Sequence, residues 1–279
     1  MKRSQPVQPA TGGAQRVGLS CRRSAVALIT LAFTLSSCAG TELTPTFPPP
    51  TGRVAVSAAL EPFASERMRA YANTSGVPAF DLEVWSMADA IRAAEDGRID
   101  MLVSGEVPPD GWFATPLGFE GIAIALNPGV DLHDLNVQQL RDIFSGLIQG
   151  WDELDGPALP VQLVIPPRGD DLRMAFERLV LTTGRVSKTA IVAPSPSATV
   201  SLLGELPGSI GLLPMSSVPE GTHLVRIEGQ SASASSLNDG RYPLRFEVIA
   251  TAPDEPPTVI RDWLVWIQAQ DGSGVEGSG

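Results

Sequence analysis

The chain has 279 residues, of which 43% are hydrophobic and 18% are charged, and its formal charge at pH 7 is −11. The apolar content is too high for a disordered chain, and the scattered positions of the 27 glycines and 25 prolines exclude a collagen-like repeat. An acidic chain without a basic stripe is not expected to bind nucleic acid.

The first 37 residues have the pattern of an export signal. Five basic residues accompany an apolar run of 13 residues, 25–37, which is shorter than the about 20 residues that a membrane-spanning helix needs. The run ends in the letters LSSC at Cys38, which resembles the lipobox of bacterial lipoproteins, in which the cysteine is lipidated. A plain secretory peptide and a short anchor helix are the alternatives. We predict a lipoprotein signal peptide over 1–37 and an extracytoplasmic protein, periplasmic or on the outer face, anchored to the cell membrane.

Removal of this segment would change the charge and the cysteine content. Residues 1–37 hold five basic and no acidic residues, so the other 242 residues carry a formal charge of −16. Cys21 would leave with the signal and Cys38 would be acylated, so no disulfide, thiolate nucleophile or cysteine-ligated metal is expected. The proline-rich segment 38–52 predicts an extended tether, and the Gly/Ser-rich segment 272–279 predicts a flexible tail.

Beyond the tether, short apolar runs alternate with helical patterns. In chain order, strands are predicted at 53–56, 80–85, 99–103, 121–126, 161–165, 209–213, 224–227 and 246–250, and helices at 59–72, 86–96, 135–148, 170–182, 198–206 and 257–269. Ser86 with Asp89, and Asn136 with Gln139, have the spacing of capping boxes at two of the helix starts. The alternation predicts an α/β protein whose parallel sheets are covered on both faces.

Four of the predicted helices begin at or just after a polar residue. In open α/β sheets, ligands bind beyond the carboxyl ends of the strands, where helix N-termini offer free backbone amides. Here these places hold Ser57, Ser86, Asp170 and Ser197. Each serine could also serve only as a helix cap. Four such places, without a recognisable catalytic set elsewhere, favour a binding cleft.

The segment 118–156 carries the most specific motif in the chain. It follows the pattern Leu-Ser/Thr-x-x-Gln-Leu-x-x-Ile-Phe-x-Gly, then Asn-Trp, through Leu135, Gln139, Leu140, Ile143, Phe144, Gly146 and Trp151, with Gly150 in place of the asparagine. This segment resembles the phosphate-binding-protein family of phosphate ABC importers, within the type II periplasmic-binding-protein-like superfamily. Weaker similarity at 85–104, 206–213 and 239–244 extends the resemblance over about 53–271.

The resemblance implies a two-lobed α/β fold in which two crossing strands form the hinge and the ligand lies between the lobes. We expect the crossings near 119–122 and 209–213, with lobe one formed by 53–118 plus 214–271 and lobe two by 119–213. The resemblance also implies a monomeric solute-binding protein that delivers a small solute, phosphate or another oxyanion, to the permease of an ABC transporter.

The loop that binds the anion in that family departs from the family pattern in this chain. Asp170-Asp171-Leu172 stands where the family has Ser-Gly-Thr, so two hydroxyl donors are lost. A carboxylate about 4 Å from an anion adds a repulsion of about 4 kcal/mol at an effective dielectric constant of 20, which Arg168 and Arg173 would offset in part. Alternatively, the first aspartate is only the N-cap and the second a favourable first-turn acid. We predict weak or absent phosphate binding and a different ligand.

The predicted ligand-binding residues lie at the strand ends and in this loop: Ser57, Ser86, Ser104, Arg168, Asp170, Asp171, Arg173 and Ser197. No catalytic residue, metal ligand or cofactor is predicted, because His133 and His223 lack motif partners and no nucleophile elbow or Walker loop is present. The protein is therefore not expected to be an enzyme. The alternative to a solute receptor is a non-transport surface protein that keeps the fold without the solute and binds or senses another molecule.

Overall fold

A computed structural model describes residues 52–76 and 80–272, which all belong to one compact unit. The predicted signal peptide, the predicted lipidation site Cys38, the tether up to its last residue and the tail beyond 272 lie outside the described residues. No helix among the described residues is both long enough and apolar enough to cross a lipid bilayer.

Eight strands form one sheet in the order β2-β1-β3-β10-β4-β8-β6-β7. Their bounds are β1 Arg53–Val56, β2 Asp81–Val84, β3 Met101–Ser104, β4 Phe113–Leu126, β6 Gln162–Ile165, β7 Ile191–Val192, β8 Ser209–Pro214 and β10 Arg245–Ala252. The strands pair in parallel at both ends of this order, whereas β4 and β10 are antiparallel to their neighbours. The predicted α/β class is confirmed, with an antiparallel centre that joins two parallel sheets.

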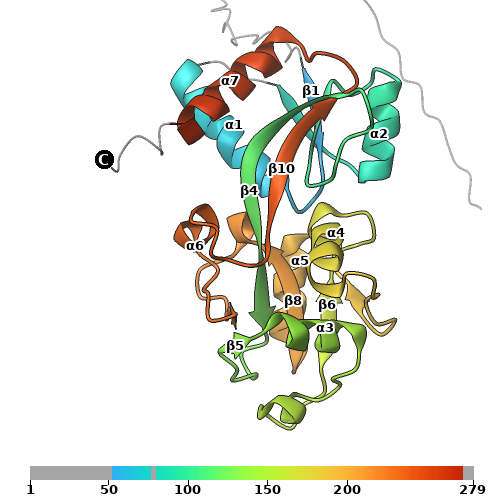
Figure 1. The fold of residues 1–279 in the computed structure, drawn as a ribbon, viewed down its shortest axis with the longest axis vertical. Coiled ribbons are helices and arrows are strands. Elements are labelled where there is room, and N and C mark those ends of the chain that lie inside the picture. Colours follow the sequence, from blue (N-terminus) through green and yellow to red (C-terminus); the bar gives the residue numbers. More distant parts are fainter. Residues whose placement is uncertain (1–51, 77–79, 273–279) are drawn as a thin grey trace, which may run out of the picture. The chain divides into compact units, whose positions relative to one another are not determined.

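The long strands β4 and β10 run side by side between two lobes (Figure 1). The first part of β4 pairs with β10, and its last five residues pair with β8. We call residues 52–118 and 245–272 lobe one, and residues 119–244 lobe two. The first crossing, predicted at 119–122, therefore lies within β4.

The second crossing differs from the prediction. Strand β9 (Arg226–Ile227) pairs with β5 (Asp134–Leu135), and Leu224 forms a bridge to Ala125, so the chain that follows β8 stays with lobe two. The predicted crossing at 209–213 and the assignment of 214–244 to lobe one are therefore wrong. The chain returns to lobe one through β10, which pairs with both β3 and β4.

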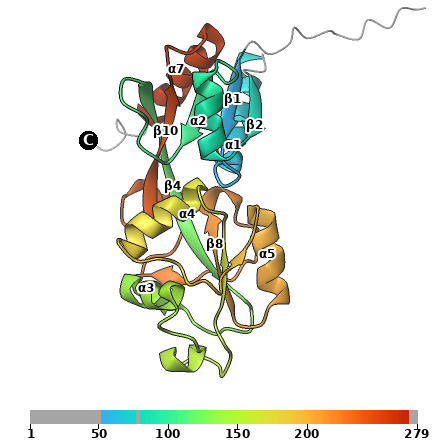
Figure 2. The same cartoon turned by 90° about the vertical axis from the view of Figure 1, so that its right-hand side faces the viewer.

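Seven α-helices cover the sheet in the described part of the chain. They are α1 Glu61–Ser75, α2 Met87–Glu95 and α7 Thr258–Gly272 in lobe one, and α3 Val137–Ser145, α4 Asp171–Phe176, α5 Pro196–Glu205 and α6 Ala234–Asn238 in lobe two. Figure 2 shows α4 and α5 on opposite sides of β8. The predicted capping box of Asn136 and Gln139 starts α3, and the left-handed Gly146 ends that helix before residue 148. A π-helical turn, Glu177–Leu181, follows α4.

Each lobe has a core built around aromatic side chains. In lobe one, the rings of Phe80 and Trp263 meet edge to face with their centroids 4.9 Å apart. In lobe two, Trp151 is fully buried and its indole N–H donates to the carbonyl of Gly208 at 2.8 Å. The tryptophan that carries the family motif is thus a core residue, because an indole of this size buries much apolar area while its N–H keeps a partner.

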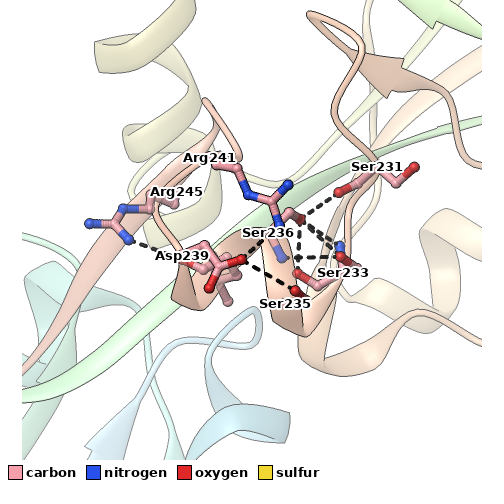
Figure 3. A network of polar contacts seen from close by, with 8 residues as sticks. Ser231, Ser233, Ser235, Ser236, Asp239, Arg241 and Arg245 are labelled. Carbon is pink, nitrogen blue, oxygen red and sulfur yellow. Dashed lines mark hydrogen bonds and ion pairs between the residues drawn. The ribbon is translucent and has the colours of Figure 1, made fainter. Parts of the chain in front are cut away.

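A serine-rich turn attaches α6 beside the crossing strands (Figure 3). Ser233 and Ser236 cap each other's backbone amides at 3.2 Å, and the hydroxyl of Ser236 also donates to the carbonyl of Ser231. Arg245, at the start of β10, donates to a carbonyl of α6 and lies 4.0 Å from the centre of the Phe119 ring. These contacts fix the point at which the chain leaves lobe two.

Candidate ligand-binding cleft

Three segments that follow parallel strands meet between the two lobes. Ser57 follows β1 and Ser104 ends β3 in lobe one, whereas Asp171 begins α4 after β6 in lobe two. The hydroxyl of Ser104 and the backbone N–H of Gly105 both donate to Oδ1 of Asp171 at 2.7 Å. A carboxylate of lobe two therefore accepts hydrogen bonds from the donors that lobe one presents to the cleft.

The Asp171 carboxylate is completely buried. Burial raises its pKa above the ordinary value, while the hydroxyls of Ser104 and Ser57 and the amide of Gly105 act in the opposite direction. The Ser57 hydroxyl lies near the Asp171 carboxylate but does not meet hydrogen-bond geometry. Ser57 Oγ and Asp171 Oδ2 therefore both lack hydrogen-bond partners among the described residues. Two buried polar atoms in the same cluster thus remain unsatisfied, which is uncommon in protein interiors.

Asp170 is a second buried carboxylate beside the first. Its Oδ1 accepts from the backbone N–H of Leu172 at 3.0 Å, so it is the N-cap of α4. Burial, together with the negative charge of Asp171, raises the pKa of Asp170 to about 6. The predicted cap role is therefore present at Asp170, whereas Asp171 does more than favour the first turn, because its side chain reaches the other lobe.

A surface ion pair also connects the two lobes. Arg178, in the π-helical turn, pairs with Glu106 at 2.6 Å and donates to the carbonyl of Gly105 at 3.4 Å. Because both side chains are partly exposed, this pair contributes less than the buried contact to Asp171. Residues 104–106 thus contact lobe two through one buried and one exposed interaction.

Little space remains beside Asp170. The adjoining cavity has a volume of about 10 Å³ and is lined mainly by alanines, prolines and leucines around Asp170. A cavity of this volume holds at most about one water molecule. In this arrangement the two lobes meet at the Asp171 carboxylate, and the cavity beside Asp170 is too small for a tetrahedral oxyanion.

A larger groove of about 680 Å³ opens next to this filled site. Lobe one contributes Leu82, Val84 and the start of α1, and lobe two contributes the start of α5 with Ser217 and Pro219. Its walls are mostly apolar, with several serine hydroxyls, and Glu61 is the one charged residue among the lining residues. The volume is within the usual range for small-molecule sites, and the lining does not favour an anion.

The other predicted ligand residues lie outside the Asp171 cluster. Ser86 caps α2, with its hydroxyl 2.6 Å from Asp89, and Ser197 lies in the groove with its hydroxyl 2.9 Å from that of Ser195. Arg168 and Arg173 line a separate pocket. The structure therefore brings together four of the eight predicted residues: Ser57, Ser104, Asp170 and Asp171.

Sequence reasoning missed Gly105 and the pair of Glu106 with Arg178. It also missed Glu120, which is buried in β4 at the crossing and accepts from the amides of Gly121 at 2.8 Å and Ser216 at 3.3 Å. Burial raises the pKa of this carboxyl. An acid beside the apolar run of a central strand was the one available signal.

Among the described residues, no group of three or more His, Cys, Asp or Glu side chains could hold a metal ion.

The family model described as the PBP superfamily domain matches residues 48–268, which is most of the chain. The chain belongs to the PBP superfamily. This membership agrees with the crossing strands and the cleft between two α/β lobes. It also confirms the family resemblance that the sequence motif indicated.

Known proteins are similar to this chain in sequence or in fold. The phosphate-binding protein PstS of Bacillus subtilis is 26% identical over 152 residues, which cover 54% of this chain and 50% of that protein. The chain thus aligns with about half the length of this curated relative. A phosphate ABC transporter substrate-binding protein from Clostridium perfringens, solved with bound phosphate, has a TM-score of 0.70 at 19% identity over 80% of this chain and 95% of its own. An ABC-type phosphate transport receptor from Vibrio cholerae has a TM-score of 0.62 at 18% identity, with the same coverage.

Proposed function

We propose that this chain is an extracytoplasmic, lipid-anchored solute-binding protein that works with an ABC importer and whose cleft does not take phosphate. Its family membership and the names of its relatives support the receptor role. The export signal and lipobox in its sequence support the location and the anchor at Cys38.

The observation that carries the ligand proposal is the position of Asp171. Its carboxylate accepts the Ser104 hydroxyl and the Gly105 amide, two donors of the kind that hold an oxyanion. A phosphate ion bound to these two donors would lie next to the buried carboxylates of Asp170 and Asp171. The repulsion of about 4 kcal/mol from each carboxylate at 4 Å would outweigh a hydrogen bond of about 1.5–3 kcal/mol. The solute is therefore expected in the neighbouring groove.

A second function is supported by the filled site. A non-transport protein that binds or senses another molecule needs the fold but no closable anion site, and a cavity of about 10 Å³ is compatible with that role. Thermal unfolding against a panel of phosphate, other oxyanions, amino acids and divalent cations separates the two functions. A shift with a solute other than phosphate supports the receptor, and a panel without any shift favours the non-transport protein.

The loop itself offers a gain-of-function test. The triple variant Asp170→Ser, Asp171→Gly and Leu172→Thr restores the hydroxyls and removes both carboxylates, so we expect it to gain phosphate binding that Ser104→Ala abolishes. At 100 times its dissociation constant, phosphate would stabilise this variant by about 2.7 kcal/mol. The control Asp171→Asn keeps a side chain of the same size at this position and should not gain phosphate binding.

The wild-type chain provides the outcome that would contradict the proposal. Micromolar phosphate binding by the wild type, measured by calorimetry and lost in Ser104→Ala, would mean that the cleft is an ordinary phosphate site despite its two carboxylates. Failure of the triple variant to bind phosphate, in a protein that still unfolds cooperatively, would mean that the aspartates are not what excludes the anion.

A further inference from the structure

The arginines of the altered loop do not face the cleft. Arg168 and Arg173 line a pocket of about 270 Å³ on lobe two together with Arg185, which follows the π-helical turn. No residue of lobe one lines this pocket. It is therefore separate from the Asp171 cluster and from the groove beside it.

Charge is unusually concentrated in this pocket. Three arginines and a single acid, Glu177, give its lining a net formal charge of +2, in a chain whose overall charge is −11. Neither Arg168 nor Arg185 forms a hydrogen bond or an ion pair within the described part of the chain, and both are exposed. Their guanidinium groups thus keep all five N–H donors available.

The third guanidinium is held rigidly at the base of the pocket. Arg173 is 6% exposed, its Nε donates to Glu177 at 2.8 Å and its Nη1 donates to the carbonyl of Pro166 at 3.2 Å. These two bonds fix the side chain and leave its Nη2 without a partner among the described residues. A buried, oriented guanidinium with free donors is suited to bidentate binding of an oxyanion.

The loop backbone also fixes Arg168. Two prolines precede this residue, and Gly169 follows it with φ of 81°, a left-handed conformation that other residues adopt at a cost. The amide of Asp170 closes the turn on the carbonyl of Pro167 at 3.3 Å. The arginine is therefore presented from a stiff turn, which reduces the entropy lost on binding.

We propose that Arg168, Arg173 and Arg185 form an anion site on lobe two, outside the cleft, for a phosphate-type oxyanion that is either free or part of a headgroup. The volume is below the usual range for drug-sized ligands, which suits a small tetrahedral group. The site goes beyond the proposed solute-binding function, since an anion here would touch lobe two alone.

Calorimetry with inorganic phosphate on the full chain at low salt tests the site. We expect weak binding that Arg185→Ala lowers about tenfold and that 0.5 M NaCl weakens, because the guanidinium groups of Arg168 and Arg185 are exposed to screening. The matched control Arg69→Ala removes an exposed arginine of α1 and should leave the affinity unchanged. Phosphate binding that is equal in Arg185→Ala and wild type, or no binding of either free phosphate or phosphatidic acid vesicles, would overturn the proposal.

Two further arms identify the source of the anion and separate this site from the cleft. Co-sedimentation with phosphatidic acid vesicles that is lost in Arg185→Ala, without binding of free phosphate, supports the site with a headgroup as its ligand; phosphatidylcholine vesicles are the control. Phosphate binding that is lost in Ser104→Ala but kept in Arg185→Ala would instead contradict both this site and the proposed exclusion of phosphate from the cleft.

Discussion

Asp170→Asn should make the protein more stable at neutral pH. Because the folded-state pKa of Asp170 is raised from 3.8 to about 6, its ionisation in the folded state is penalised by about 3 kcal/mol. Asparagine is as good an N-cap as aspartate, so the bond to Leu172 is kept. The variant loses a favourable charge at the start of α4, worth about 0.3–1 kcal/mol. The expected net gain at pH 7.5 is about 2 kcal/mol.

The stability difference between wild type and Asp170→Asn should depend on pH. A carboxyl whose folded-state pKa is raised contributes stability that is complete below about pH 4 and is lost as the pH rises through about 6. The wild-type free energy of unfolding should therefore decline over this window, and Asp170→Asn should decline less. A smaller decline remains in the variant, because burial also raises the pKa of Asp171 and of Glu120.

Urea unfolding at pH 4, 5, 6 and 7.5 measures both effects. The two proteins should have similar free energies of unfolding at pH 4 and differ by about 2 kcal/mol at pH 7.5, a shift of about 4–8 °C in Tm. Asp152→Asn, an exposed acid in the first turn of the 3₁₀ helix Trp151–Leu154, is the matched control and should show no such difference. Parallel pH profiles for wild type and Asp170→Asn would refute the reasoning.

Two further substitutions test the buried contacts. Ser104→Ala removes one of the two donors to the buried Asp171 carboxylate and should lower the free energy of unfolding by about 1.5–3 kcal/mol in urea; an unchanged midpoint would mean that the lobes do not close on this carboxylate. Trp151→Ala should lower the free energy of unfolding by about 3–5 kcal/mol, because the side chain is fully buried. The control Leu147→Ala changes a side chain that is 73% exposed and should alter this free energy by less than about 0.5 kcal/mol. Similar losses in both variants would place the motif tryptophan outside the core.

Local signals in the sequence predicted much of the fold. The capping box at Asn136 is present as predicted, and Ser86 is the N-cap of α2 without the reciprocal bond from its own amide to Asp89; caps are predictable because they depend on side chains only three residues apart. The start of β4 was missed, since Pro116 and Gly118 normally interrupt strands. These residues are nevertheless held in an antiparallel pair with β10, with a register shift between Val248 and Ile249. Pairing between residues so far apart overrides local preference and leaves no local trace.

The candidate site could be predicted only in part for the same reason. The unusual loop acids were visible in the sequence, and so was the cap role of Asp170. The contact of Asp171 with Ser104 joins residues 67 positions apart, so it depends on how the lobes close. The orientation of Arg168 and Arg173 could not be predicted either. It depends on the turn at Gly169 and on the hydrogen bond from Arg173 to Glu177.

The buried Asp171 contact makes the protein its own competitor. A group tethered by the chain competes at an effective concentration in the millimolar range or above, so an external anion of equal intrinsic affinity at 1 µM would hold the same donors about one thousandth of the time. Any solute that reached Ser104 and Gly105 would have to exchange with the carboxylate of α4. Occupancy by such a solute and closure on Asp171 would then be mutually exclusive, so binding would be coupled to separation of the lobes rather than to their closure.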